Sequence, residues 1–269
     1  MYEVNLSLNL HKVEAKMGKI IAFANQKGGV GKTTSAVNVA ASLGVIGYKV
    51  LLVDLDPQGN ATSGVGVSKK NLKLTIQDVL LEKAGVEDVV IQTKFNNLSL
   101  LPANITLANA EFQLFDADNS QMELKNALLK VKDSYDYVII DCPPSLGMLT
   151  VNALSASDGV VIPMQCEFYA LEGLSQLMIT VSRIKQYYNE KLTVTGILIT
   201  MYNKRLLLSM QVMAELKKHY TDKLFDTCIS RNVKLSEAPG FGMPVYYHDK
   251  SSKGSAEYLD VAKELSSRI

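Results

Sequence analysis

The chain has 269 residues, of which 47% are hydrophobic and 20% are charged, and its formal net charge is +1. This length allows one large domain or two small ones with a substantial buried core. The near-neutral charge argues against a strongly basic nucleic-acid protein, although it is compatible with a local basic patch. No apolar run approaches the length of a membrane span. Three widely spaced cysteines form no C-x-x-C pair, which predicts free thiols in a reducing cytosol: Cys142, Cys166 and Cys228.

The first sixteen residues carry no arginine and lack the apolar core of a signal peptide. Met17 stands just ahead of the first apolar run and resembles a natural start. We therefore expect residues 1–16 to be a weakly ordered extension. No linker, repeat or low-complexity segment divides the remainder, so residues 17–269 are expected to form a single domain.

A glycine-rich loop follows the first predicted strand, residues 20–24, and leads into a predicted helix. Strand, glycine loop and helix in this order are typical of a phosphate-binding loop. Its backbone N–H groups and the positive end of the helix dipole bind the anion. In such a loop Lys32 would reach the outer phosphates, and the Thr33 hydroxyl would hold Mg²⁺.

The loop departs from the simple pattern G-x-x-x-x-G-K-[ST] in two ways. Gln26 occupies the position of the leading glycine, and Lys27 adds a second lysine. A Gly-Lys-Thr triplet alone is common by chance, but three glycines, two lysines and two threonines between a strand and a helix are not. We therefore predict nucleotide contacts from the whole loop: Lys27, Gly28, Gly29, Val30, Gly31, Lys32, Thr33 and Thr34.

Further apolar runs alternate with helical patterns along the rest of the chain. Continuous Val, Leu and Ile fit strands that are buried on both faces. The pattern predicts an α/β fold with a doubly wound, mostly parallel sheet flanked by helices. The predicted strands lie within residues 49–57, 98–102, 137–144, 159–163, 193–200 and 223–229, and the clearest helices within 172–185, 206–219 and 255–268.

Aspartates follow two of these apolar runs. Asp54 and Asp56 end one run with the same parity, and Asp141 ends another. Ligands of doubly wound sheets bind at the carboxyl ends of the strands, where the glycine loop also falls. We expect Asp141 and Asp56 to contribute to Mg²⁺ binding and Asp56 to orient a water for in-line attack on the γ-phosphate. For Asp54, a turn or helix cap is the better interpretation.

Five segments together resemble one protein family. The loop at 27–34 resembles the deviant Walker A loop of the ParA/MinD family, and residues 52–64 are similar to the second motif of its ParA/Soj branch. The match extends over essentially residues 17–269 through segments 141–145, 169–174 and 231–239. The chain thus resembles a chromosome or plasmid partition ATPase with a P-loop NTPase fold.

The resemblance implies ATP and Mg²⁺ as cofactors and slow hydrolysis of ATP to ADP and phosphate. It also implies a homodimer that forms on ATP binding and encloses two nucleotides. Lys27 would cross to the partner's phosphates in a role like that of an arginine finger, and Gly28 would lie where the two backbones approach closely. Lys32 and Asp56 would complete the catalytic set, and Thr33 and Asp141 match the family's Mg²⁺ residues.

The family's adenine pocket matches residues 229–233 here. Arg231 and Asn232 are the expected contacts, and Asn203 is a further candidate. Ser230 replaces the proline usual in the family, which leaves the packing of the base open.

The resemblance further implies non-specific binding of double-stranded DNA by the ATP-bound dimer. A ParB/Spo0J-type partner would stimulate hydrolysis, and the protein would be cytoplasmic and associated with a bacterial nucleoid. Residues 204–234 contain seven basic and three acidic side chains, so this segment carries about +4 and the rest about −3. Within it, Arg205 and Lys234 match DNA-contacting positions of the Soj group, although a solvated basic face explains any single residue equally well.

Three other functions compete with this interpretation. A MinD-like membrane-associated positioning ATPase would need a basic, bulky apolar C-terminal helix, whereas residues 258–269 are mixed in charge. A reductase resembling the nitrogenase iron protein would need cysteines in loops suited to an iron–sulfur cluster, and the three cysteines do not occupy such loops. A metabolic P-loop enzyme would need an acceptor pocket, which no motif specifies.

Overall fold

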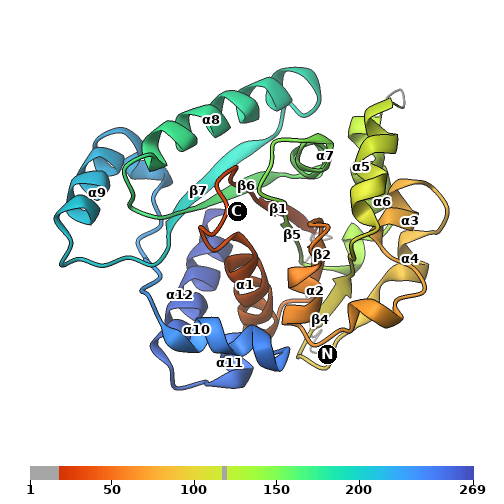
Figure 1. The fold of residues 1–269 in the computed structure, drawn as a ribbon, viewed down its shortest axis with the longest axis horizontal. Helices are drawn as coiled ribbons and strands as arrows, with labels where there is room; N and C mark the ends of the chain where they lie inside the picture. The colour runs from red at the N-terminus through yellow and green to blue at the C-terminus, as the bar shows by residue number, and fades with distance from the viewer. Residues whose placement is uncertain (1–17, 117–119) are drawn as a thin grey trace, which may run out of the picture.

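The computed structural model describes residues 18–116 and 120–269, so the expected extension at residues 1–16 lies outside the described part (Figure 1). Seven strands of the described chain form one sheet in the order β3-β4-β2-β5-β1-β6-β7. Neighbouring strands are parallel except β3, which runs antiparallel to β4 at one edge. The strands are β1 Lys19–Phe23, β2 Val50–Asp54, β3 Ile91–Gln92, β4 Leu98–Leu101, β5 Tyr137–Asp141, β6 Gly159–Met164 and β7 Thr193–Ile199.

Helices pack on both faces of this sheet, which confirms the predicted doubly wound α/β fold (Figure 1). The side chains of α1 and α12 share one hydrophobic cluster with the strands, and α3 to α9 contribute to the other. The helices are α1 Lys32–Ile46, α2 Asn60–Gly64, α3 Ile76–Leu80, α4 Val86–Val89, α5 Leu107–Asp116, α6 Glu123–Leu129, α7 Met148–Ala156, α8 Ala170–Tyr187, α9 Leu207–Tyr220, α10 Val233–Glu237, α11 Val245–His248 and α12 Lys253–Arg268.

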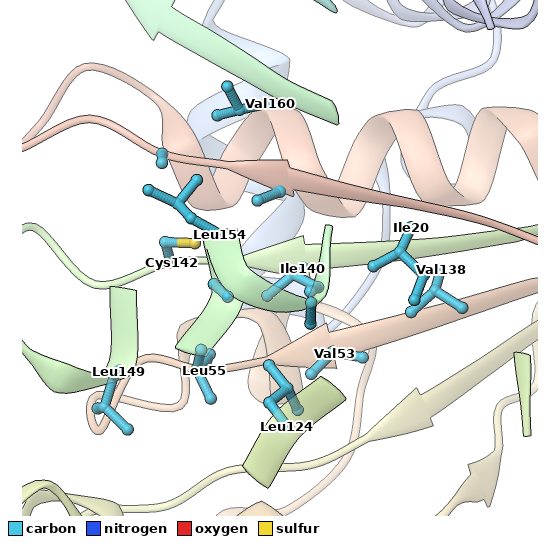
Figure 2. Close-up of a cluster of buried hydrophobic side chains, with 14 of the residues drawn as sticks. Ile20, Val53, Leu55, Leu124, Val138, Ile140, Cys142, Leu149, Leu154 and Val160 are labelled. Atoms are coloured by element: carbon cyan, nitrogen blue, oxygen red, sulfur yellow. The ribbon is translucent and has the colours of Figure 1, made fainter. Parts of the chain in front are cut away.

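The central strands are buried on both faces, as their continuous apolar sequences predict. Successive residues of β1 alternate between the two clusters: Ile20 joins one and Ile21 the other. Figure 2 shows the first cluster, in which Val138 of β5 lies beside Ile20, its register partner on β1. This double burial fixes the ends of the central strands relative to one another.

The strand register brings the predicted site together. Asp54 at the end of β2 pairs with Asp141 at the end of β5, and Asp141 in turn pairs with Phe23 at the end of β1. The glycine-rich loop at residues 27–34 begins four residues after Phe23. Three segments that are distant in the sequence therefore end side by side at the carboxyl edge of the sheet.

One predicted strand is wrong. Residues 223–229 follow β7 only through scattered backbone bonds, such as Phe225 N–H to Ile197 O at 3.0 Å, and form no ladder. The backbone N–H groups of Asp226 and Thr227 donate instead to the Glu264 carboxylate on α12, at 2.7 and 3.2 Å. These amides are bonded to side chains of a helix, so they are not available to extend the sheet.

Candidate nucleotide-binding site

The glycine-rich loop runs from the end of β1 to the start of α1. Gly29 and Gly31 have φ angles of +74° and +83°, a left-handed conformation that residues with a Cβ rarely adopt. Gly28 differs from both, since its φ is outside this region and a Cβ placed on it would meet nothing within 4 Å. The chain itself therefore requires glycine at 29 and 31 but not at 28.

Side chains from neighbouring strand ends hold the carbonyl groups of the loop. The Thr200 hydroxyl donates to Val30 O at 2.8 Å, and Gln165 Nε2 donates to Gly29 O at 2.7 Å. Within the described part of the chain, none of the backbone N–H groups of residues 28–34 has a hydrogen-bond acceptor. The loop thus presents a set of unpaired donors at the N-terminus of a long helix, which is the chemistry of an anion site.

The two lysines of the loop have different surroundings. Lys32 is buried, and its ammonium donates to Lys27 O at 2.9 Å. Burial lowers the pKa of Lys32, while the carboxylates of Asp141 and Asp56 oppose that shift. Lys27 is half-exposed and forms an ion pair with Glu167 in the loop before α8. One lysine therefore points into the site, and the other lies on the surface beside it.

Asp54 acts as a helix cap, as its sequence context favoured. Its carboxylate accepts hydrogen bonds from the N–H and the hydroxyl of Thr62 in α2, both at 2.7 Å. A third bond comes from Asp56 N–H at 3.3 Å. The carboxyl group is nevertheless fully buried, and this burial raises the pKa of Asp54 to about 6. Its donors and its burial assign Asp54 to the structure of the site rather than to ligand contact.

Asp141 is the exceptional carboxylate. It is fully buried, and neither of its oxygens has a hydrogen-bond partner in the described structure. Burial and the neighbouring Asp54 raise the pKa of Asp141 well above its ordinary value, while the Thr33 hydroxyl and Lys32 act in the opposite direction. An unpaired buried carboxylate is costly, so this position is suited to a bound cation.

The oxygen donors around Asp141 fit Mg²⁺. Thr33 lies beside Asp141, and Asp56 lies near enough to Asp141 to raise its pKa further. Asp56 is buried in the loop after β2, where its carboxylate accepts Gln58 N–H at 2.8 Å. Among the described residues there is no cluster of three or more His, Cys, Asp or Glu side chains that could hold a metal without other ligands. This sparse set matches Mg²⁺, which usually keeps water and phosphate ligands.

A cavity of about 210 Å³ lies next to the loop. Gly31 and Thr34 of the loop line it together with Arg231 and Asn232, the two residues expected to contact adenine. Asn203 lines a neighbouring hollow of about 360 Å³ instead. Six lining residues fall outside both the predicted loop and the predicted segment 229–233: Thr200, Met201, Leu235, Ser236, Pro239 and Tyr258.

The two predicted DNA contacts lie in different settings. Arg205 is exposed in the loop between β7 and α9, and its N–H donates to the Asn203 side chain at 3.0 Å. Lys234 lies in α10 and forms an ion pair with Glu237 at 2.8 Å. The hydrogen bond to Glu237 raises the pKa of Lys234. Arg205 thus presents an unshared charge within the described structure, whereas the charge of Lys234 is partly neutralised.

Comparisons with known proteins agree with this geometry. Residues 18–194 match the AAA_31 family, described as an AAA domain. The sporulation initiation inhibitor protein Soj of Bacillus subtilis is 54% identical over 249 residues, which cover 93% of this chain and 98% of Soj. The chromosome partitioning protein ParA of Myxococcus xanthus is 47% identical, over 94% of this chain and 90% of ParA.

A solved structure supports the same assignment at the level of the fold. Cobyrinic acid a,c-diamide synthase from Mycobacterium smegmatis, crystallised with ADP and magnesium, is 37% identical and superposes with a TM-score of 0.81. The match covers 92% of this chain and 93% of the synthase. The higher identity to the partition proteins, over nearly their whole length, decides the family. The chain belongs to the ParA/Soj family of partition ATPases.

Proposed function

We propose that this chain is an ATP-dependent DNA-partition switch that binds ATP with Mg²⁺ and hydrolyses it slowly. The observation that carries the proposal is the juxtaposition of two unsatisfied groups. The loop offers unpaired N–H donors, and Asp141 offers a buried carboxylate with no partner beside them. A magnesium–triphosphate ligand would satisfy both, because its phosphates accept hydrogen bonds and its cation binds carboxylate oxygen.

Each residue of the site has a distinct role in this proposal. The loop N–H groups and Lys32 bind the phosphates, and Thr33 and Asp141 hold Mg²⁺ with a contribution from Asp56. Bound Mg²⁺ would neutralise charge on the phosphate oxygens. Asp56 orients the attacking water and accepts its proton, for which its position beside Lys32 and Asp141 is suited.

The active form is proposed to be a homodimer with two nucleotides at its interface. Two features of the loop support this: Gly28 faces open space, and Lys27 lies on the surface, where it can reach a second chain. In the single chain the Lys27 ammonium is paired with Glu167, so dimerisation must exchange this partner for a phosphate of the other subunit. In this dimer Lys27 would bind the nucleotide of the other subunit, and Lys32 would bind the nucleotide of its own subunit.

The dimer is further proposed to bind double-stranded DNA without sequence preference in a bacterial cytoplasm. The basic side chains between residues 204 and 234 support this, since those other than Lys234 are exposed. Two copies in a dimer would double the number of phosphate contacts, so affinity would rise steeply on dimerisation and fall steeply with salt. A ParB-type protein would stimulate hydrolysis and thereby release the DNA.

The described structure favours this function over a MinD-like membrane ATPase. The apolar side chains of α12, including Tyr258, Val261 and Leu265, are buried in the core beside α1. They are therefore committed to packing and are not free to enter a lipid surface. Within residues 18–116 and 120–269, no helix combines the length and apolarity that crossing a membrane requires.

The decisive experiment measures DNA binding with ATP, with ADP and without nucleotide. We expect DNA retention only with ATP. In gel filtration with ATP, Lys32→Ala should stay monomeric because it loses the nucleotide, whereas Asp56→Ala should keep ATP and stay dimeric. Equal DNA binding in all three nucleotide states, or an Asp56→Ala monomer with normal hydrolysis, would refute the proposal.

A further inference from the structure

Two carboxylates of α12 hold the segment that leads into one wall of the cavity. Glu264 on α12 accepts the backbone N–H groups of Asp226 and Thr227. Glu257 lies seven residues earlier on the same helix face and accepts Ser230 N–H at 2.9 Å. Because Ser230 lines the cavity, Glu257 fixes the position of a lining residue.

The Ser230 side chain is oriented by the same carboxylate. Its hydroxyl donates to Glu257 Oε2 at 3.1 Å, while the Glu257 Oε1 atom lies 3.4 Å from the Lys253 ammonium. An ionised carboxylate can only accept hydrogen bonds, and a serine hydroxyl has a single proton. The Ser230 proton is therefore committed to Glu257, and its oxygen can act toward the cavity only as an acceptor.

We propose that Ser230, oriented by Glu257, is a determinant of base specificity in this chain. An acceptor at this wall matches the amino group on carbon 6 of adenine, which donates. It opposes the oxygen on the same carbon of hypoxanthine or guanine, which accepts. The inference rests on the proposed nucleotide site and identifies which residue reads the base. A proline, usual in the family at this position, has neither the N–H nor the hydroxyl. It could not form the two hydrogen bonds that Ser230 donates to Glu257 in this chain.

Calorimetric titration with Mg²⁺-ATP and Mg²⁺-ITP tests the proposal, because the two ligands differ only in the purine group at carbon 6 and the adjacent ring proton. The wild-type chain should bind ATP about tenfold more tightly than ITP. This ratio is the scale expected when ATP forms a hydrogen bond to Ser230 Oγ and ITP places an acceptor against it. Ser230→Ala should reduce this ratio to about twofold or less. Glu257→Ala should reduce it as well, because it removes the acceptor of the Ser230 hydroxyl and frees that proton for a 6-oxo group.

Glu264→Gln is the matched control, since Glu264 holds the same segment of backbone but its bonded residues do not line the cavity. This substitution should weaken the binding of ATP and of ITP by the same factor, so the ratio of the two affinities should not change. An unchanged ratio in Ser230→Ala, with ATP still bound, would overturn base selection and leave the proposed function intact. Binding of neither nucleotide by the wild-type chain would refute the proposed function itself.

Discussion

Gly28→Ala should affect the stability of the single chain and the affinity of the dimer in different ways. The φ of Gly28 is outside the left-handed region, and an added Cβ would meet nothing within 4 Å. The substitution should therefore leave the free energy of unfolding unchanged or raise it by about 0.4–1 kcal/mol, through the reduced freedom of the unfolded chain. Gly31→Ala is the control in the same loop: its φ of +83° should cost about 1–2 kcal/mol.

The effect of Gly28→Ala on association should be large. An extra methyl group between closely packed backbones costs about 1–3 kcal/mol, and a symmetric interface contains it twice. The dissociation constant of the ATP-bound dimer should thus rise by at least about 30-fold. Urea unfolding without nucleotide measures the first effect, and sedimentation with ATP in an Asp56→Ala background measures the second. A Gly28→Ala protein that dimerises with wild-type affinity would refute the idea that two backbones meet at this loop.

Three further predictions concern charges near the site. Glu167→Gln should strengthen ATP-dependent dimerisation several-fold in sedimentation, because it frees Lys27 from a half-exposed ion pair worth about 0.2–1 kcal/mol. Asp54→Ala should lower the free energy of unfolding by about 1–3 kcal/mol in urea titrations, because it leaves buried donors of α2 without an acceptor. Arg205→Glu should weaken DNA retention and reduce its salt dependence without altering ATPase activity in the absence of DNA, and Lys234→Glu should have a smaller effect because the charge of Lys234 is already shared.

Each of these predictions has an outcome that contradicts it. Weaker dimerisation of Glu167→Gln would mean that Glu167 supports the active arrangement of Lys27. Wild-type stability of Asp54→Ala would show that the cap of α2 is dispensable. A salt titration of DNA binding that is the same for Arg205→Glu and the wild-type chain would place the DNA surface elsewhere.

Elements whose structure is determined by residues adjacent in the sequence could be predicted from the sequence. The glycine loop, the strands around it and the ends of those strands carry their own signals, because double burial demands continuous apolar residues. The cap at Asp54 was also favoured correctly, since an aspartate before a loop commonly bonds backbone N–H groups. These features define the carboxyl edge of the sheet, where the phosphate site lies.

What the sequence could not reveal depends on distant partners. The segment 223–229 has the composition of a strand, but two of its amides are bonded to the Glu264 carboxylate, 37 and 38 residues further along the chain. The sequence pattern predicts Tyr258 to be an ordinary core residue of an amphipathic helix. In the structure it lines the cavity, and its hydroxyl lies 3.0 Å from the Ser35 hydroxyl on α1. The short edge strand β3 has only two residues and gave no periodic signal.

The position of α12 in the chain determines when the cavity can be completed during synthesis. This helix follows every other described element in the chain, so the ribosome releases it after the glycine loop and all seven described strands. Until it docks, the segment 226–230 lacks the hydrogen bonds that Glu257 and Glu264 accept, and the cavity lacks the part of its lining that Tyr258 supplies. We therefore expect a nascent chain to bind a nucleotide more weakly before α12 has been made than after it has docked. The full stabilisation by bound ligand is then expected only for chains that have been synthesised through this helix.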